Sequence, residues 1–223
     1  MHLKKYIGES CWAFSICGLV IYFISLPIFY FALKIGFDQF IAAIIFFIIN
    51  LFLTGAIHED GLADLADGMF VGKNIKTKLK IMNDSRIGVF GVLAIVIIFN
   101  LKIFSIAYVT PQLNNYIHLI LIAMVSRYCM LFFLRFLKPL KKDGLGKGFT
   151  INENKTLIIG FLPIIPFIFF LNLSGLVIVF VMLISSLIFF LIIKKKFRGQ
   201  TGDICGANQQ INEVIGLLTL TLI

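Results

Sequence analysis

The chain has 223 residues, of which 60% are hydrophobic, and a mean hydropathy of +1.01. A soluble domain of this length cannot bury so much apolar surface in one core, so the composition favours a membrane protein over a soluble one. The formal charge of +9 does not indicate a nucleic-acid partner, because the basic residues lie in short loops between apolar runs and are not interleaved with exposed aromatic residues.

The apolar segments, taken in chain order, predict six to seven membrane spans. Four of them are long enough to cross about 30 Å of hydrocarbon at about 1.5 Å per residue, namely 11–33, 37–57, 88–109 and 116–134. The stretch 157–193 is interrupted by a polar turn at 172–175 and is predicted to form an antiparallel pair of spans. The run 214–223 is too short to cross alone and is predicted as a seventh, partial span. The expected fold is an all-α polytopic transmembrane helical bundle, with residues 1–223 forming a single integral-membrane domain.

The distribution of Lys and Arg predicts the orientation of these spans. Nearly all of the 20 basic residues fall in the N-terminal segment and in alternate loops, which places those segments in the cytosol. Nearly all acidic residues fall on the same side, so we expect a multi-pass protein of a bacterial or archaeal cytoplasmic membrane with its active site facing the cytosol. Lys102 lies near the outer end of its span, where its ammonium group is expected to snorkel to the membrane surface.

The segment 58–68, His-Glu-Asp-Gly-Leu-Ala-Asp-Leu-Ala-Asp-Gly, follows the second span and predicts a metal site. On a helix Asp60, Asp64 and Asp67 fall at i, i+4 and i+7, which puts three carboxylates on one face. Like charges at this spacing repel, and a hard divalent cation with oxygen ligands removes the repulsion. Magnesium fits best, and it points to a phosphorylated substrate. The alternative is a solvated acidic helix start, although ordinary acidic helices carry Lys rather than a further Asp at i+4.

A second polar block, Asp84-Ser85-Arg86-Ile87-Gly88, leads into the third span. Asp84 is a candidate fourth ligand or general base, and Arg86 can hold a phosphate through two parallel hydrogen bonds. A helix cap followed by a cytosolic Arg accounts for this stretch almost equally well.

Further candidates lie in and after the fourth predicted span. The pair Ser126-Arg127 lies about seven residues from its cytosolic end, and an unpaired Arg at that depth costs at least about 3 kcal/mol. Arg127 should therefore face the bundle interior and pair with a motif carboxylate or a substrate phosphate. The loop that contains Asp143 mixes glycines and lysines, which is weak evidence for phosphate binding. The stretch 199–208 is rich in small and polar residues and is expected to line the site through Thr201 and Asp203.

These blocks, together with Gly206-Ala207 and Glu213, occur in the order and at the spacing of the cobalamin synthase family, also called adenosylcobinamide-GDP ribazoletransferase. The chain resembles this family from about residue 15 to its C-terminus, and the first two blocks are its most specific part. The resemblance implies two departures from the family pattern: the chain is expected to lack a short N-terminal piece usual in the family, and Gln210 stands where a Glu is common.

The resemblance implies a transferase that completes cobalamin biosynthesis. A ribose hydroxyl of α-ribazole, or of its 5′-phosphate, would attack the corrinoid-side phosphorus of adenosylcobinamide-GDP and release GMP. Asp60, Asp64 and Asp67 would supply the Mg²⁺ site, with Asp67 also catalytic, and Asp84, or with lower rank His58, would be the general base. The remaining candidates for substrate binding are Arg86, Ser126, Arg127, Asp143, Thr201 and Asp203. Lipid is the expected surrounding, and association of several copies is left open.

Two other functions remain as alternatives. CDP-alcohol phosphatidyltransferases also displace a nucleoside monophosphate at a membrane Asp cluster, and their Asp-Gly-x-x-Ala-Arg pattern is imperfectly echoed by residues 60–64. A cation transporter would need carboxylates at mid-bilayer depth, whereas these lie at the predicted cytosolic ends of spans. The four cysteines are scattered without the spacing of a zinc site or a disulfide framework.

Overall fold

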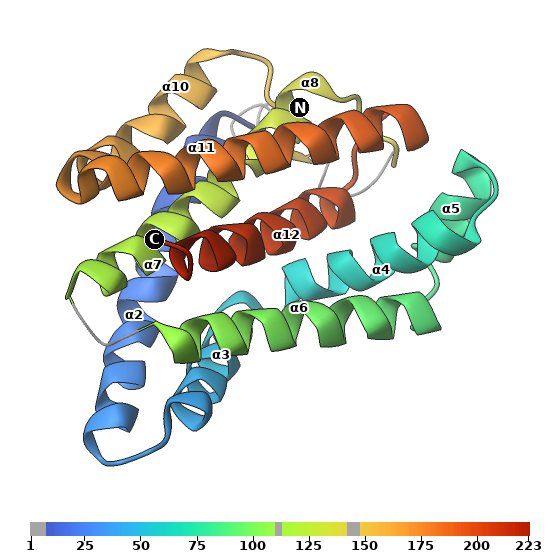
Figure 1. Ribbon diagram of the computed structural model, residues 1–223. Helices are drawn as coiled ribbons and strands as arrows, with labels where there is room; N and C mark the ends of the chain where they lie inside the picture. The colour runs from blue at the N-terminus through green and yellow to red at the C-terminus, as the bar shows by residue number, and fades with distance from the viewer. Residues whose placement is uncertain (1–7, 110–112, 142–147) are drawn as a thin grey trace.

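The computed structural model describes residues 8–109, 113–141 and 148–223, and these residues form helices without any strand. The all-α fold class is therefore confirmed. The elements in Figure 1 are η1 (Ser10–Ala13), α2 (Phe14–Lys34), α3 (Gln39–Thr54), α4 (Ile57–Val71), α5 (Ile75–Ile81), α6 (Val89–Tyr108), α7 (Leu113–Tyr128), α8 (Met130–Phe136), α10 (Lys155–Phe161), η2 (Leu162–Ile164), α11 (Ile165–Lys196) and α12 (Gly202–Leu220).

Four helical segments in the described part of the chain are long and apolar enough to cross a membrane. They are Ser10–Lys34, Val89–Tyr108, Asn115–Phe136 and Lys155–Lys196. Helices α3 and α4 pass the same test only together, and a 90° bend separates them. The structure thus supports a multi-pass membrane protein with four or five such segments, and the predicted count of six to seven spans is not confirmed.

The segment Lys155–Lys196 contains the predicted polar turn. As one straight helix its 42 residues would be about twice as long as the hydrocarbon layer is thick. Asn172 has non-helical backbone angles, with φ 52° and ψ −128°, and Figure 1 shows the chain turning back at this end of α11. The hydroxyl of Ser174 secures the turn through hydrogen bonds to the Leu171 carbonyl (2.8 Å) and the His118 ring (2.7 Å). The break therefore lies where the sequence predicts it.

Helix α12 corrects the prediction for the C-terminal region. The predicted partial span at 214–223 is the second half of a 19-residue helix that begins at Gly202. Thr201 caps this helix, because its hydroxyl accepts a hydrogen bond from the Ile204 backbone N–H at 3.2 Å. The helix runs through the middle of the bundle and packs against α4, α6, α7 and α11 (Figure 1).

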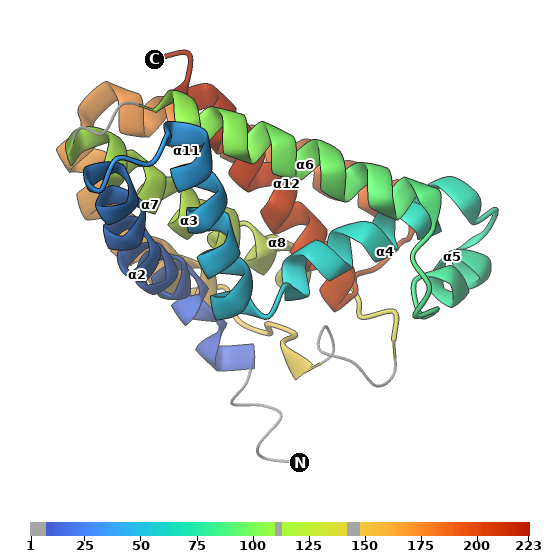
Figure 2. The same cartoon turned by 90° about the horizontal axis from the view of Figure 1, so that it is seen from below.

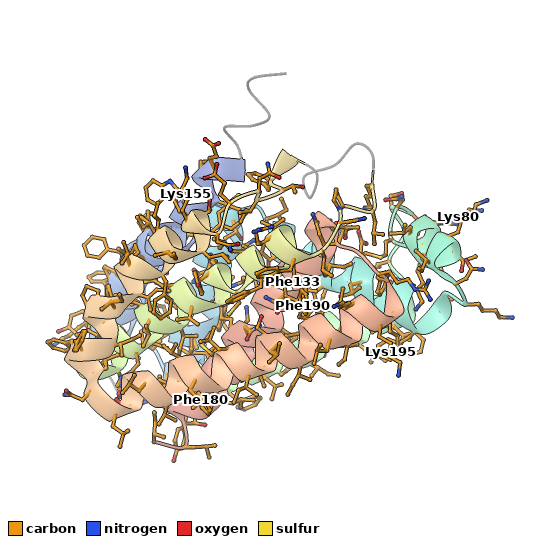
Figure 3. The ribbon with its side chains drawn as sticks, turned by 90° about the horizontal axis from the view of Figure 1, so that it is seen from above. Lys80, Phe133, Lys155, Phe180, Phe190 and Lys195 are labelled. Atoms are coloured by element: carbon orange, nitrogen blue, oxygen red, sulfur yellow. The ribbon has the colours of Figure 1, made fainter. Side chains whose placement is uncertain are left out.

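Apolar side chains divide between a packed interior and an exposed outer face. Phe133 and Phe190 pack edge to face between α8 and α11 with ring centroids 5.4 Å apart. Phe180 points away from the bundle and is 64% exposed, and Lys80 and Lys155 lie at the periphery (Figure 3). Large exposed apolar side chains of this kind are what a lipid-facing surface requires.

Candidate active site

The acidic motif is positioned by the sharp bend between α3 and α4. Gly55 (φ 63°) and Ala56 (φ 56°) both adopt the left-handed backbone conformation, which costs about 1–2 kcal/mol for a residue with a side chain. The bend redirects the chain by 90°. As a result His58 and Asp60 lie in the first turn of α4 instead of continuing α3.

Two glycines allow α4 to lie directly against the start of α12 (Figure 2). A Cβ atom at Gly61 would lie 2.8 Å from the Cα of Asp203, and one at Gly206 would lie 3.0 Å from the Cα of His58. No larger residue fits at Gly61 without moving the α12 backbone. The crossing therefore brings Asp203, from the last helix, next to the acidic motif of α4.

The first of two cavities at this crossing has a volume of about 380 Å³. Its polar lining includes His58, Asp60, Lys141, Thr201 and Asp203. The Lys141 ammonium group forms an ion pair with Asp203 at 2.8 Å, and the Thr201 hydroxyl donates to the same carboxylate oxygen at 3.2 Å. The predicted site residues Thr201 and Asp203 thus lie beside Asp60, and their substrate-binding roles stay predictions.

The second cavity has a volume of about 340 Å³. It is lined by Asp60, Asp64, Asp84, Ser85 and Arg86, among others. Asp60 lines both cavities. Burial, together with the charges of Asp60, Asp203 and Asp67, raises the pKa of Asp64 to about 7, and Lys141 partly offsets this rise. The carboxylates of α4 and α12 therefore form one electrostatic group between the two cavities.

Asp67 is placed differently from the other two motif carboxylates. It is buried, and its two oxygens accept hydrogen bonds from the backbone N–H groups of Gly88 (2.7 Å) and Gly91 (2.9 Å) at the start of α6. A carboxylate at a helix N-terminus stabilises the orphan N–H groups there. Among the described residues no group of three or more His, Cys, Asp or Glu side chains is arranged to hold a metal ion. The metal and catalytic roles of Asp67 stay predictions, while the structure shows its carboxylate engaged with α6.

Asp84 and Arg86 form an exposed, two-pronged ion pair beside the second cavity. The Arg86 Nε donates to Oδ1 at 3.1 Å and Nη2 donates to Oδ2 at 2.9 Å, and the Arg86 backbone N–H also donates to Oδ1. These hydrogen bonds lower the pKa of Asp84 to about 2. A carboxylate with so low a pKa is a weak base, which disfavours Asp84 as the general base. The guanidinium group of Arg86 is already bound to Asp84, and a substrate phosphate would have to displace this carboxylate.

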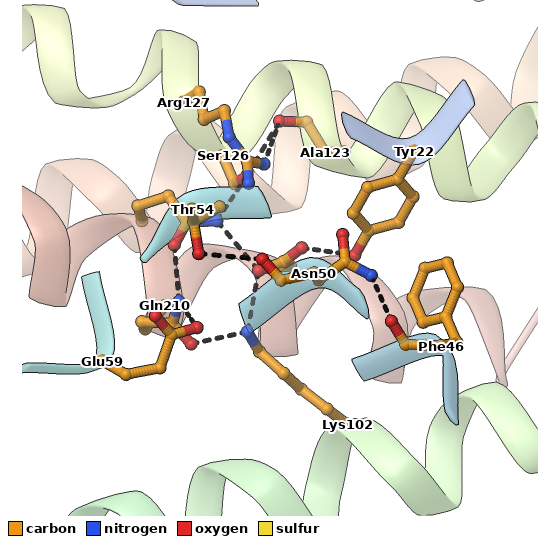
Figure 4. A network of polar contacts seen from close by, with 12 residues as sticks. Tyr22, Phe46, Asn50, Thr54, Glu59, Lys102, Ala123, Ser126, Arg127 and Gln210 are labelled. Atoms are coloured by element: carbon orange, nitrogen blue, oxygen red, sulfur yellow. Dashed lines mark hydrogen bonds and ion pairs between the residues drawn. The ribbon is translucent and has the colours of Figure 1, made fainter. Parts of the chain in front are cut away.

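Ser126 and Arg127 lie in the bundle interior and line neither cavity. Arg127 is 4% exposed and donates from Nη1 to the Ala123 carbonyl at 3.1 Å, while its Nε has no partner. Ser126 donates to the same carbonyl and accepts from Gln209 at 3.3 Å (Figure 4). Arg127 faces the interior as expected, whereas Asp143 lies outside the described residues.

The structure also reveals a buried polar network that the sequence reasoning missed. Lys102 is 2% exposed and does not snorkel, because its ammonium group pairs with Glu213 at 2.8 Å and donates to Gln210 at 2.5 Å (Figure 4). Gln210 in turn donates to Glu59 at 2.8 Å, next to Asp60 in α4. The available signal was Lys102, a basic residue placed within an otherwise apolar segment.

Comparison with known proteins places the chain in a family. The family description "Cobalamin-5-phosphate synthase" matches residues 2–221. The chain belongs to this family. Membership confirms the resemblance drawn from the sequence blocks and makes the protein an enzyme of cobalamin biosynthesis.

Relatives in this family come from several bacteria. A Clostridium tetani protein is 35% identical over 206 residues, covering 90% of this chain and 81% of the relative. A Bradyrhizobium diazoefficiens protein is 30% identical over 220 residues, covering 95% and 82%. An Allorhizobium ampelinum protein is 34% identical over 225 residues, covering 94% and 84%. All three are named adenosylcobinamide-GDP ribazoletransferase. No solved structure matches the chain.

Proposed function

We propose that this protein joins α-ribazole, or its 5′-phosphate, to adenosylcobinamide-GDP and releases GMP. The observation that carries the proposal is that Asp60 lines two adjoining cavities. A reaction between two large substrates needs two binding spaces that meet at the reacting atoms. The names of the relatives supply the two substrates.

The proposed chemistry is a displacement at phosphorus. The acceptor oxygen forms a bond to the corrinoid-side phosphorus, the bond from that phosphorus to the GMP oxygen breaks, and the hydroxyl proton passes to a base. Asp84 and His58 are both candidates for the base, because each lines a cavity together with Asp60. Arg86 holds Asp84, and burial together with the charge of Arg127 lowers the pKa of His58 to about 3. Lys141 supplies positive charge in the first cavity and Arg86 in the second.

We further propose that the reaction requires Mg²⁺ held by Asp60 and Asp64. Carboxylate oxygens that repel one another at the cavity wall are a suitable donor set for this hard cation. Mg²⁺ commonly binds through one or two carboxylates and completes its shell with water and substrate phosphate, so three converging protein ligands are not required. When bound, Mg²⁺ would neutralise charge on the pyrophosphate and on the leaving GMP.

The proposed setting is a cytoplasmic membrane with both cavities open to the cytosol. The support is the concentration of Lys and Arg in the loops on the side of the acidic motif. The phosphatidyltransferase and transporter alternatives gain no support from the family match.

A direct assay tests this function. Detergent-purified protein is incubated with MgCl₂, adenosylcobinamide-GDP and α-ribazole 5′-phosphate, and GMP and the new corrinoid are quantified by chromatography. We expect the two products in equal amounts, and neither product with EDTA or without acceptor. GMP formed without a new corrinoid would show a hydrolase and contradict the proposal.

A further inference from the structure

The first cavity has an apolar, aromatic side as well as its polar one. Phe14 at the start of α2 and Phe149 contribute two rings packed edge to face with centroids 5.7 Å apart. Met130 and Leu134 of α8 complete this side. Every lining side chain contributed by α2 and α8 is therefore apolar. Such a surface suits a flat aromatic ring without polar groups on its edge.

The size of the cavity limits what can occupy it. A volume of about 380 Å³ lies at the lower end of the range for small-molecule sites, roughly 300–1,000 Å³. A nucleoside fits this space, whereas a corrin ring with its side chains does not. A guanine base would fit by size, but its edge carries several hydrogen-bonding groups that apolar side chains from α2 and α8 would leave unpaired.

The polar side of the cavity suits the sugar of the same ligand. Asp60 and Asn83 line both cavities, so a ribose hydroxyl beside them would lie near phosphorus bound in the second cavity. Lys141 is only partly exposed, and an ammonium group can keep a carboxylate partner and still donate to a phosphate. A nucleoside bound with its base against the two Phe rings would thus present its ribose to the charged wall.

We infer that the first cavity is the binding site of the acceptor nucleoside, with its aromatic base against Phe14 and Phe149 and any 5′-phosphate at Lys141. The inference rests on the proposed function for the identity of the acceptor. It assigns only the pyrophosphate of the donor to the second cavity, with the corrin ring on the surface beyond it.

Equilibrium binding tests this assignment without requiring turnover. Labelled α-ribazole and labelled adenosylcobinamide-GDP are each dialysed against the purified protein and its Phe149→Leu and Phe14→Leu variants, with thermal unfolding as the check of folding. Loss of an aromatic contact should raise the Kd for α-ribazole roughly 3- to 10-fold and leave the Kd for the donor within about twofold. Phe136→Leu is the matched control, because Phe136 is 55% exposed on α8 and lines neither site cavity.

Two results would overturn the inference. One is unchanged α-ribazole binding in both folded variants. The other is a higher Kd for GMP or for the donor in the two variants, with the Kd for α-ribazole unchanged. That result would assign the cavity to guanosine. A Lys141→Gln variant tests the position of the phosphate separately. It should raise the Kd for α-ribazole 5′-phosphate more than the Kd for α-ribazole. An equal rise in both would show that the 5′-phosphate does not bind at Lys141. Failure of the wild-type protein to release GMP would contradict the proposed function alone.

Discussion

Lys102 of α6 and Glu213 of α12 form an ion pair of 2.8 Å in which each side chain is less than 5% exposed. The Tyr22 hydroxyl also donates to Glu213, so three helices meet at this carboxylate. Removing one partner of a buried pair leaves the other charge without compensation, which typically costs about 3–5 kcal/mol. The pair therefore holds α12 in register against α6.

A double-mutant cycle tests this first prediction. Lys102→Met and Glu213→Gln should each lower the free energy of unfolding in detergent by about 3–5 kcal/mol, and the double variant should lose less than the sum because neither charge is then stranded. Lys34→Met is the control, since Lys34 is exposed at the end of α2. Additive losses would show that the two groups do not interact energetically.

The second prediction separates the three motif carboxylates. Asp60→Asn and Asp64→Asn should lower GMP release at least about 100-fold without changing thermal stability, because both side chains line the second cavity and serve charge stabilisation. Asp67→Asn should instead lower the free energy of unfolding by about 1–3 kcal/mol, because an amide cannot accept both N–H groups of α6. Equal loss of activity at unchanged stability in all three would favour the original three-ligand metal site.

The difference among these carboxylates shows where sequence reasoning stops. Helical spacing placed Asp60, Asp64 and Asp67 on one face, and the structure keeps them close enough for their charges to act on one another. Spacing along one helix carries no information about which neighbour each side chain meets. Only the position of α6 reveals that Asp67 contacts backbone N–H groups, and only the crossing at Gly61 brings in Asp203.

Helix α12 gives the same lesson for the fold. A hydropathy profile finds lipid-facing spans well, because it detects long apolar runs. It failed for α12 because this helix is surrounded by protein and carries polar side chains inward, among them Asn208, Gln209, Gln210, Asn212 and Glu213. The Thr201 cap, with Asp203 in the first turn, marks the helix start in the sequence, but a hydropathy profile does not use this signal.

The third prediction concerns the break at Asn172. Reporter fusions after residue 174 should appear on the opposite side of the membrane from fusions after residue 200, because the chain turns back at Asn172. Fusions after residue 75 should match those after residue 200. Agreement of all three positions would show that Lys155–Lys196 crosses once, if at all, and would lower the number of spans.

The fourth prediction uses the pKa of Asp84. The folded-state pKa of about 2 lies below the ordinary value of 3.8, so pairing with Arg86 stabilises the protein at pH values above about 4 and is lost as the pH falls through 2. Across the range of an activity assay Asp84 is already ionised. The acid limb of the pH–rate profile should therefore keep its midpoint in Asp84→Asn, whatever the change in rate. Loss of that limb in this variant alone would identify Asp84 as the general base after all.

The fifth prediction concerns Arg127, whose buried guanidinium lines neither cavity. Its charge acts on Glu213 and on His58, and its Nη1 donates to the Ala123 carbonyl. Arg127→Lys should keep this charge and lower stability only modestly, whereas Arg127→Ala should destabilise the protein in detergent, because Glu213 then faces Lys102 alone. In both variants KM for either substrate should stay within about twofold if the protein remains folded, since neither substrate reaches position 127. A large rise in KM for Arg127→Lys at unchanged thermal stability would instead show that the planar guanidinium binds a substrate phosphate, and that substrate reaches further toward α7 than the two cavities indicate.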